Sequence, residues 1–389
     1  MLFAKLNDLS IGGKGAYGIA ASAVERKADL PTYLRITDIF DDGTLNLSEL
    51  KSVDAPNSDK YILKPNDIVF ARTGGSTGRN YFYDGSDGVF VYAGFLIKFS
   101  IDPEKVNPKY VKYYCRSKQY NDWVQSFNTG STRGNINAQT FGNMEIPLPE
   151  RKQQDYLVSI LEPIDEKIKN NKQVNDNLQQ QAFSVFDNLI ANAENNDCTV
   201  SDYAFLNPKR TLAKNQVARS IDMSQLSTSG AFPSGWEMKP FNGGMRFTNG
   251  DTLLARITPC LENGKTAFID FLDDGEIGFG STEYIVLAPK NDTPPEMLYC
   301  LARYPAFVDY AVKNMNGSSG RQRVSAETVG QYRLPLFDKH SLVLFKEVVS
   351  PMFLKMRYNS LENMRLAVLR DALLPKLMSG EIDVSAVQL

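Results

Sequence analysis

Histidine is almost absent from this chain. His340 is the single imidazole in 389 residues, so a metal site built from several histidines is excluded, and histidine-dependent acid–base chemistry would rest on one side chain. The four cysteines lie far apart and form no CxxC pair, which gives no indication of a zinc knuckle or a dithiol redox site. They are typical of buried thiols in a reducing compartment, and we expect a cytoplasmic protein with no metal.

Long apolar stretches and an excess of charge of either sign are also missing. No run of about 18 apolar residues predicts a membrane span, and the segment MLFAKLNDLS has no stretch of signal-peptide length. Lys and Arg number 43 against 45 Asp and Glu, a formal net charge of −2. Composition alone therefore indicates a globular chain, long enough for two domains, with no obvious polyanionic partner and no membrane.

The chain contains a tandem duplication. Residues 66–72 (NDIVFAR) match residues 250–256 (GDTLLAR) at an offset of 184. Further on, an offset of 188 pairs Gly142 with Gly330, Pro147 with Pro335, Leu148 with Leu336, Pro163 with Pro351, Lys167 with Lys355, Asn171 with Asn359 and Leu178 with Leu366. One offset held across so many Gly, Pro and Asn matches predicts two units of about 1–195 and 196–389.

The first part of each unit has the composition of a mixed α/β globule. Short β-like runs lie between turn signals, and we expect strands at 67–72, 88–100, 252–257 and 283–288. Helical pieces are predicted at 108–126 and at 295–313.

The second part of each unit is predicted to be one long helix, at 151–193 and 339–378. A seam with the 3.5-residue period of a coiled coil gives Ile164, Ile168, Asn171, Asn175, Leu178, Ala182, Val185 and Leu189, and, 188 residues on, Met352, Met356, Asn359, Asn363, Leu366, Arg370, Leu373 and Leu377. Buried asparagines need partners and so set the helix register. Antiparallel pairing predicts that Asn171 faces Asn363 and Asn175 faces Asn359; the alternative places them on a solvated face.

Pro163 and Pro351 fall inside these helical patterns. Each removes a backbone donor and crowds the preceding turn, so a kink or a break is expected there. The predicted fold class is α/β (α+β): two similar mixed α/β domains, separated by two long antiparallel helices in a pseudo-two-fold tandem repeat. The expected domains are globules at 1–150 and 196–337 and spacer helices at 151–195 and 338–389, the last including the C-terminal tail.

This architecture suits DNA, which has local two-fold axes. Two related domains can read two half-sites in inverted orientation. Residues 1–149 carry 17 basic and 16 acidic side chains, and residues 196–337 carry 14 and 15, so neither globule is basic. A DNA-binding surface would therefore be a local patch, and a more basic partner would help to hold the duplex.

Several segments, in their order and duplication, resemble the specificity subunits of type I restriction–modification enzymes. They are 63–69 (LKPNDIV) with Arg72, 130–137 (GSTRGNIN), 146–149 (IPLP) followed by Gln153 and Gln154, 280–284 (GSTEY) and 373–382 (LLPKLMSGEI). The second junction, 334–338 (LPLFD), departs from the family pattern because it lacks the Gln pair.

The resemblance implies a division of labour. The two globules would be target recognition domains that each read one half of a bipartite, asymmetric site in double-stranded DNA. The helices would set the gap and dock two methyltransferase subunits, which bind S-adenosylmethionine and methylate adenine. Motor–nuclease subunits join for restriction. The specificity subunit itself would be non-catalytic and hold no cofactor.

Enzymatic alternatives find little support in the residues. No NPP[FY] aminomethyltransferase motif is present, and the P-loop-like triplet 264–266 (GKT) is preceded by Pro259 where a glycine is needed. A nuclease pattern from Asp8 with 25–27 (ERK) has a spacing that is common by chance. The runner-up remains a stand-alone DNA-modifying enzyme, a methyltransferase or nuclease, and a third alternative is a structural scaffold that binds no DNA.

Candidate DNA-binding residues lie in loops that combine Gly with Arg, Lys, Asn, Gln, Ser or Thr, because such loops approach phosphates and base edges closely. The loop 72–79 is the richest, with a simple hairpin turn as its alternative. Segments 132–137 and 320–325 occupy equivalent places and could equally cap the long helices. The candidates are Lys14, Tyr17, Arg72, Thr73, Ser76, Thr77, Arg79, Arg133, Asn135, Asn137, Arg256, Lys265, Ser281, Thr282, Arg321, Gln322, Arg323 and Ser325.

Overall fold

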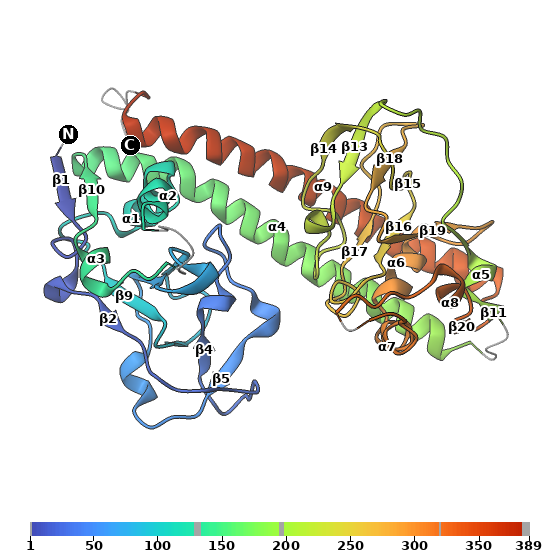
Figure 1. Ribbon diagram of the computed structural model, residues 1–389, viewed down its shortest axis with the longest axis horizontal. Helices are drawn as coiled ribbons and strands as arrows, with labels where there is room; N and C mark the ends of the chain where they lie inside the picture. The colour runs from blue at the N-terminus through green and yellow to red at the C-terminus, as the bar shows by residue number, and fades with distance from the viewer. Residues whose placement is uncertain (1, 128–133, 194–197, 319, 383–389) are drawn as a thin grey trace. The chain divides into compact units, whose positions relative to one another are not determined.

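The computed structural model describes residues 2–127, 134–193, 198–318 and 320–382. The chain forms two compact units, one of 1–164 with 369–389 and one of 165–368. Each unit contains one globule and a part of each long helix (Figure 1).

Two four-stranded sheets and a strand pair build the first globule. The first sheet is antiparallel, in the order β2-β9-β6-β7, and the second has the order β3-β5-β4-β8 with β4 parallel to β8. The strands are β1 (Leu2–Lys5), β2 (Ala16–Tyr17), β3 (Ala23–Val24), β4 (Thr32–Leu34), β5 (Lys51–Val53), β6 (Asp67–Ala71), β7 (Asn80–Tyr83), β8 (Phe90–Tyr92), β9 (Leu96–Ser100) and β10 (Glu145–Leu148), which pairs with β1.

The second globule repeats this plan. Its first sheet has the order β12-β19-β16-β17, its second the order β14-β13-β18-β15 with β13 parallel to β18, and β11 pairs with β20. Only the fourth strand of the second sheet differs, since β15 pairs with β18 whereas β3 pairs with β5. The strands are β11 (Cys198–Thr199), β12 (Ala204–Leu206), β13 (Val217–Ile221), β14 (Glu237–Pro240), β15 (Met245–Phe247), β16 (Thr252–Ala255), β17 (Thr266–Phe268), β18 (Gly278–Gly280), β19 (Tyr284–Pro289) and β20 (Arg333–Leu334).

Short helices cover the sheets. They are α1 (Pro108–Tyr114), α2 (Lys118–Gln125) and α3 (Ala138–Gly142) in the first globule and α5 (Val200–Tyr203), α6 (Pro295–Arg303), α7 (Pro305–Lys313) and α8 (Ala326–Gly330) in the second. The 3-10 segments are η1 (Ile11–Gly13), η2 (Ile36–Asp38), η3 (Leu47–Glu49), η4 (Ser58–Tyr61), η5 (Gly74–Ser76) and η6 (Met223–Gln225).

Three elements that the sequence predicted as single pieces are each divided in two. The predicted helix 108–126 is α1 and α2, because Ser117 caps a new helix by accepting from the backbone N–H of Tyr120 (3.2 Å). The predicted helix 295–313 is α6 and α7, and Pro305 opens the second piece. The predicted strand 88–100 is β8 and β9, joined by a turn in which the N–H of Leu96 donates to the carbonyl of Ala93 (2.8 Å).

The central strand of each first sheet is buried on both faces. In β6, Ile68 and Phe70 pack into one hydrophobic cluster, while Val69 and Ala71 pack into another. In β16, Leu254 packs into one hydrophobic cluster and Leu253 into another, because successive side chains of a strand point to opposite faces. Such burial explains why the duplicated segment reads as a continuous apolar run in both units.

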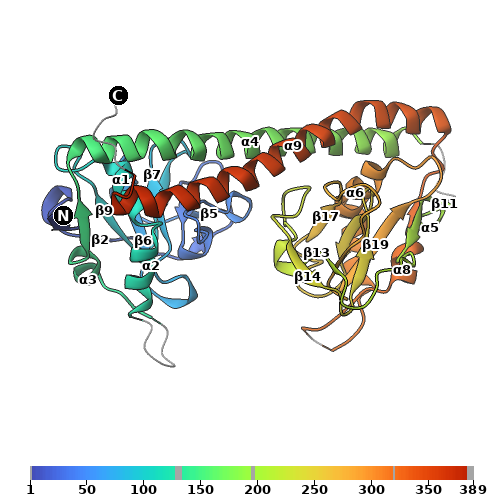
Figure 2. The ribbon, with the colours of Figure 1, turned by 90° about the horizontal axis from the view of Figure 1, so that it is seen from above.

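The long helices are α4 (Arg151–Ala191) and α9 (Lys339–Ser379), which pack together (Figure 2). In the second unit the Nδ2 of Asn171 donates to Oδ1 of Asn363 (2.9 Å), and Nδ2 of Asn359 donates to Oδ1 of Asn175 (2.8 Å). The predicted antiparallel pairing is confirmed. Asn171 and Asn359 are 4% and 2% exposed, so the solvated-face alternative is wrong.

Both helices run through their internal prolines, so no break occurs at Pro163 or Pro351, and the alternative expectation of a kink stays a prediction. A proline removes a single backbone hydrogen bond, and the turns on either side stay packed. Leu161 and Val349, two residues before each proline, are completely buried. No helix in the described part of the chain is both long and apolar enough to cross a membrane.

Candidate nucleic-acid interface

The acidic residue of the duplicated segment begins the central strand of each globule. Asp67 and Asp251 are each 1% exposed, and each accepts from the backbone N–H three residues earlier, of Lys64 and Thr248 (both 2.8 Å). Asp251 is also paired with Arg210 (2.8 Å), yet burial raises the pKa of Asp251 to about 6. These buried carboxylates stabilise the start of each central strand. The arginine of each duplicated segment, Arg72 or Arg256, follows the other end of that strand.

In the first globule that arginine, Arg72, lies where three segments meet. Its N–H donates to the carbonyl of Phe95 (3.1 Å), and its carbonyl accepts from the N–H of Ile136 (2.9 Å). Its guanidinium lies 5.3 Å from the ring centre of Tyr17 and 5.8 Å from that of Phe95, two exposed aromatic side chains. Within the described residues, its buried Nε has no acceptor. Cation–π contact holds the guanidinium without using its N–H donors, which leaves them for a ligand.

In the second globule Arg256 makes the equivalent two backbone hydrogen bonds. Its N–H donates to the carbonyl of Glu283 and its carbonyl accepts from the N–H of Val324 (both 3.0 Å). Its buried Nε also has no acceptor in the described part of the chain. Beside it, Arg323 forms a bidentate pair with Glu283, with Nε–Oε2 and Nη2–Oε1 distances of 2.9 and 2.7 Å. Hydrogen bonding from Arg323, aided by the charge of Arg256, holds the pKa of Glu283 below its ordinary value.

The loop 72–79 joins the antiparallel strands β6 and β7, so the hairpin interpretation is confirmed. Thr77 Oγ1 donates to the carbonyls of Gly74 (2.8 Å) and Gly134 (2.9 Å). Arg79 donates to Asp41 (2.6 Å) and to the carbonyl of Ile39 (3.2 Å). These two candidates already have partners inside the globule, and their role toward DNA stays a prediction.

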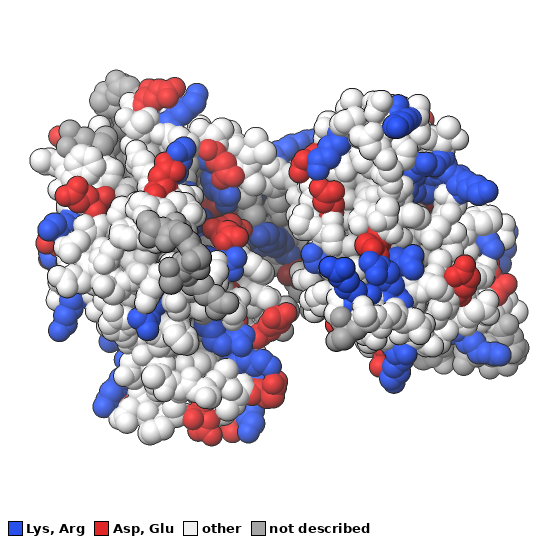
Figure 3. Space-filling model, in the orientation of Figure 1, with Lys and Arg blue, Asp and Glu red and all other residues white. Residues whose placement is uncertain are grey.

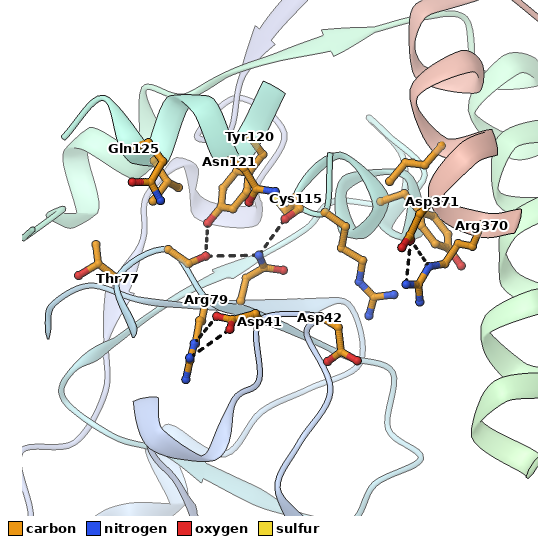
Figure 4. Close-up of a pocket in the computed structure, with 16 residues that line it drawn as sticks. Asp41, Asp42, Thr77, Arg79, Cys115, Tyr120, Asn121, Gln125, Arg370 and Asp371 are labelled. Carbon is orange, nitrogen blue, oxygen red and sulfur yellow. Dashed lines mark hydrogen bonds and ion pairs between the residues drawn. The ribbon is translucent and has the colours of Figure 1, made fainter. Parts of the chain in front are cut away.

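Thr77 and Arg79 also line a cavity of about 450 Å³ in the first unit (Figure 4). Helix α9 contributes Arg370 and Asp371 to its wall, and these two neighbours form an ion pair (2.9 Å). Both acidic and basic side chains line the cavity, so it does not favour a ligand of one charge. Burial raises the pKa of the Cys115 thiol in its wall, which keeps that thiol protonated.

Asn137 and Ser325 are the N-caps of short helices. The Oδ1 of Asn137 accepts from the N–H of Thr140 (2.8 Å), and the Oγ of Ser325 accepts from the N–H of Thr328 (3.0 Å). The alternative in which these segments cap the long helices is wrong, because the capped helices are α3 and α8. Strands β10 and β20 separate these caps from α4 and α9.

The remaining candidates differ in exposure and in partners. Lys265 Nζ donates to the carbonyl of Met223 (2.8 Å), and the Oγ of Ser281 accepts from the N–H of Glu283 (3.1 Å). Arg133 lies outside the described residues. Four further candidates are exposed, namely Lys14, Asn135, Thr282 and Arg321. Three are half-buried, namely Thr73, Ser76 and Gln322. Figure 3 shows a group of basic side chains with an acidic one among them on the second globule.

Phe95 and Glu283 were missed as site residues by sequence reasoning. The signal was present, because the offset of 188 aligns Phe95 with Glu283 and Asn135 with Arg323. The structure bears out both alignments, since Phe95 and Glu283 bond equivalent arginines, and bridges join Thr73 to Asn135 and Ile257 to Arg323. Among the described residues, no group of three His, Cys, Asp or Glu side chains is arranged to hold a metal ion.

Residues 25–180 match the protein family described as type I restriction modification DNA specificity domain. The chain contains this match within its first globule and the first part of α4. It is similar to the type I restriction enzyme HindI specificity subunit of Haemophilus influenzae, at 22% identity covering 92% of this chain and 97% of that protein. The MjaIX specificity subunit of Methanocaldococcus jannaschii is 21% identical, covering 73% of this chain and 71% of that protein.

A solved structure supports the fold. The S subunit of a type I restriction–modification system from M. genitalium has a TM-score of 0.55 to this chain at 17% identity. The likeness covers 97% of this chain and 95% of that subunit, so it includes both globules and both long helices.

Proposed function

We propose that this chain is the DNA sequence-specificity subunit of a type I restriction–modification complex. Each globule, at 1–150 and 196–337, reads one half of a bipartite, asymmetric DNA site. The observation that carries this is the duplicated site: both globules have the same order in the first sheet, and both hold an arginine at the same point by the same two backbone hydrogen bonds. One protein with two equivalent sites suits a target with two halves.

The long helices, within 151–195 and 338–389, set the gap between half-sites and dock two methyltransferase subunits. The paired asparagines support this role, because polar pairs inside a helix seam favour one register over its neighbours. The methyltransferase subunits supply S-adenosylmethionine and the chemistry, and motor–nuclease subunits join for restriction. This chain contributes recognition only.

A single selection experiment separates this function from its alternatives. The chain is purified with the methyltransferase subunits and used to select from a randomised DNA library, and the bound DNA is sequenced. We expect a motif of two specified blocks with an unspecified gap. One contiguous motif, methyl transfer by the isolated chain, or no enrichment would contradict the proposal, the last in favour of a scaffold.

Single arginine substitutions test the assignment of globules to half-sites. Arg321 is exposed in the loop between α7 and α8, and Arg133 lies at the equivalent place in the sequence. Arg321→Ala is expected to weaken selection at one block only, and Arg133→Ala at the other. Equal loss at both blocks, or at neither, would count against one globule per half-site.

A further inference from the structure

The two globules place different side chains at equivalent points of one scaffold. Arg72 and Arg256 make equivalent backbone hydrogen bonds, but the residue whose carbonyl accepts from the arginine N–H is Phe95 in the first globule and Glu283 in the second. Contacts shared by both half-sites carry no information that distinguishes them, and phosphate contacts are of this kind. Differences between the half-sites must come from positions where the globules differ.

The second such position is 135 in the first globule and 323 in the second. Asn135 forms an isolated antiparallel bridge with Thr73, and Arg323 forms one with Ile257. Thr73 and Ile257 directly follow Arg72 and Arg256 in the sequence, so Asn135 and Arg323 occupy equivalent places beside the two arginines. Their side chains differ in the two groups that best distinguish purines, since an amide matches adenine and a guanidinium matches guanine in the major groove.

Arg323 is held in a defined direction. Glu283 accepts from its Nε and Nη2, and the carbonyl of Arg321 accepts from its Nη1 (3.1 Å). A guanidinium has five N–H donors, so three engaged donors leave one on each Nη. The Arg323 side chain is 39% exposed. Figure 2 shows that the loop between α7 and α8, where Arg323 lies, is on the side of the second globule away from α4 and α9.

We propose that Arg323, positioned by Glu283, reads a guanine in the half-site of the second globule, and that Asn135 reads an adenine at the equivalent place in the first. The two free Nη donors match the O6 and N7 acceptors of guanine. Glu283 is a positioning residue: its charge also offsets the attraction of Arg256 and Arg323 for phosphate, which favours the base over the backbone. This assignment rests on the proposed function.

Asn135 suits its part because its side chain is exposed and makes no hydrogen bond with the described part of the chain. Its amide offers one donor edge and one acceptor, which match N7 and the N6 amino group of adenine. No carboxylate stands at the position equivalent to Glu283, since Phe95 is there, and an uncharged reader needs none.

The test uses the complex of the chain with its methyltransferase subunits. DNA selection is repeated with the parent, Arg323→Ala, Glu283→Ala and the control Lys313→Ala, an exposed residue of α7 in the same globule. Arg323→Ala should lower discrimination for guanine at one position of one block by roughly 5- to 150-fold. Glu283→Ala should relax the same position and raise binding to unrelated DNA. Lys313→Ala should match the parent, and thermal melting confirms that each variant is folded.

A double substitution that introduces the residues of the second globule into the first tests the same assignment independently. The double variant Phe95→Glu with Asn135→Arg should change one position of the first block from adenine to guanine and leave the second block unchanged. A parent complex that selects no bipartite motif would overturn the proposed function itself. A bipartite motif that keeps every base preference in Arg323→Ala, or no change at the first block in the folded double variant, would overturn this inference alone.

Discussion

Asp251 shows at the scale of one residue how a duplicated sequence preserves a structural role. It accepts from the N–H of Thr248 and from Arg210, and its copy Asp67 accepts from Lys64 and lies 3.1 Å from Lys98. The basic partner comes from a different place in each globule, while the backbone contact is the same. A carboxylate at this point is therefore retained for the start of the central strand, whatever the nearby loops bind.

Removing the Asp251 carboxylate should destabilise the second unit. Asp251→Ala leaves Arg210, whose side chain is 15% exposed, without its partner, and removes the bond to Thr248. We expect the free energy of unfolding to fall by about 3 kcal/mol, measured by urea unfolding. The control is Asp292→Ala, at an exposed ion pair with Lys339, which should change it by less than about 1 kcal/mol. Equal effects of the two substitutions would contradict this role.

The pH dependence of stability provides a second test of Asp251. The folded chain keeps a proton on Asp251 up to about pH 6, whereas the unfolded chain releases it near 3.8. The folded state therefore binds more protons between these values, and this group's contribution to the free energy of unfolding falls as the pH rises from about 4 to 6. Asp251→Asn should make the pH profile flatter on its falling side. An unchanged difference between variant and parent across this range would contradict the raised pKa.

At the scale of elements, the pair α4 and α9 depends on a polar centre within an apolar seam. Nδ2 of Asn171 donates to Glu362 (2.7 Å) as well as to Asn363, and Nδ2 of Asn175 donates to Ser360 (3.2 Å) and to the carbonyl of Met356 (3.3 Å). The network uses several acceptors. A buried polar group left alone costs more than a polar pair contributes.

Asn171→Leu should therefore destabilise the second unit by about 1–3 kcal/mol, because Asn363 and Glu362 lose a donor that holds them. Asn170→Leu, at an exposed position of the same helix, is the control and should stay within about 0.5 kcal/mol. Urea unfolding followed by circular dichroism measures both. A neutral Asn171→Leu would show that the seam tolerates an unpaired centre.

Pro163 should lower the stability of α4, since its ring removes one backbone donor from a helix that continues through it. Pro163→Ala is expected to raise the free energy of unfolding by about 1–3 kcal/mol, and Pro351→Ala should act in the same direction. Thermal melting of both variants checks this. A loss of stability in either variant would show that the packing depends on the shape which the proline gives that turn.

For the whole molecule, the repeating patterns of the sequence predicted the structure better than its local loop motifs did. The seam predicted which asparagines meet, and the constant offset predicted which loop positions are equivalent. The division of helices 108–126 and 295–313 was missed, because a Ser cap and a proline were read as parts of longer helices. The Glu283–Arg323 pair was missed as well, since two residues 40 positions apart meet only when β19 and the loop before α8 are folded together.

Charge balance predicts how the chain binds DNA without partners. The net charge is −2, and local arginines must attract phosphate against nearby acids such as Glu283. We expect the isolated chain to bind DNA weakly, with an affinity that falls steeply between 50 and 200 mM salt. Addition of the methyltransferase subunits should tighten binding. Fluorescence anisotropy over a salt series measures both, and tight, salt-insensitive binding by the chain alone would contradict this picture.

The central claim is that this chain chooses the DNA sequence on which a partner acts, and mapping methylated adenines across a genome tests it most directly. Cells that express the methyltransferase subunits are compared with and without this chain. We expect methylation at a motif of two specified blocks separated by a gap of constant length, present only with the chain. Methylation of the same motif without the chain, or of one uninterrupted motif with it, would contradict the account.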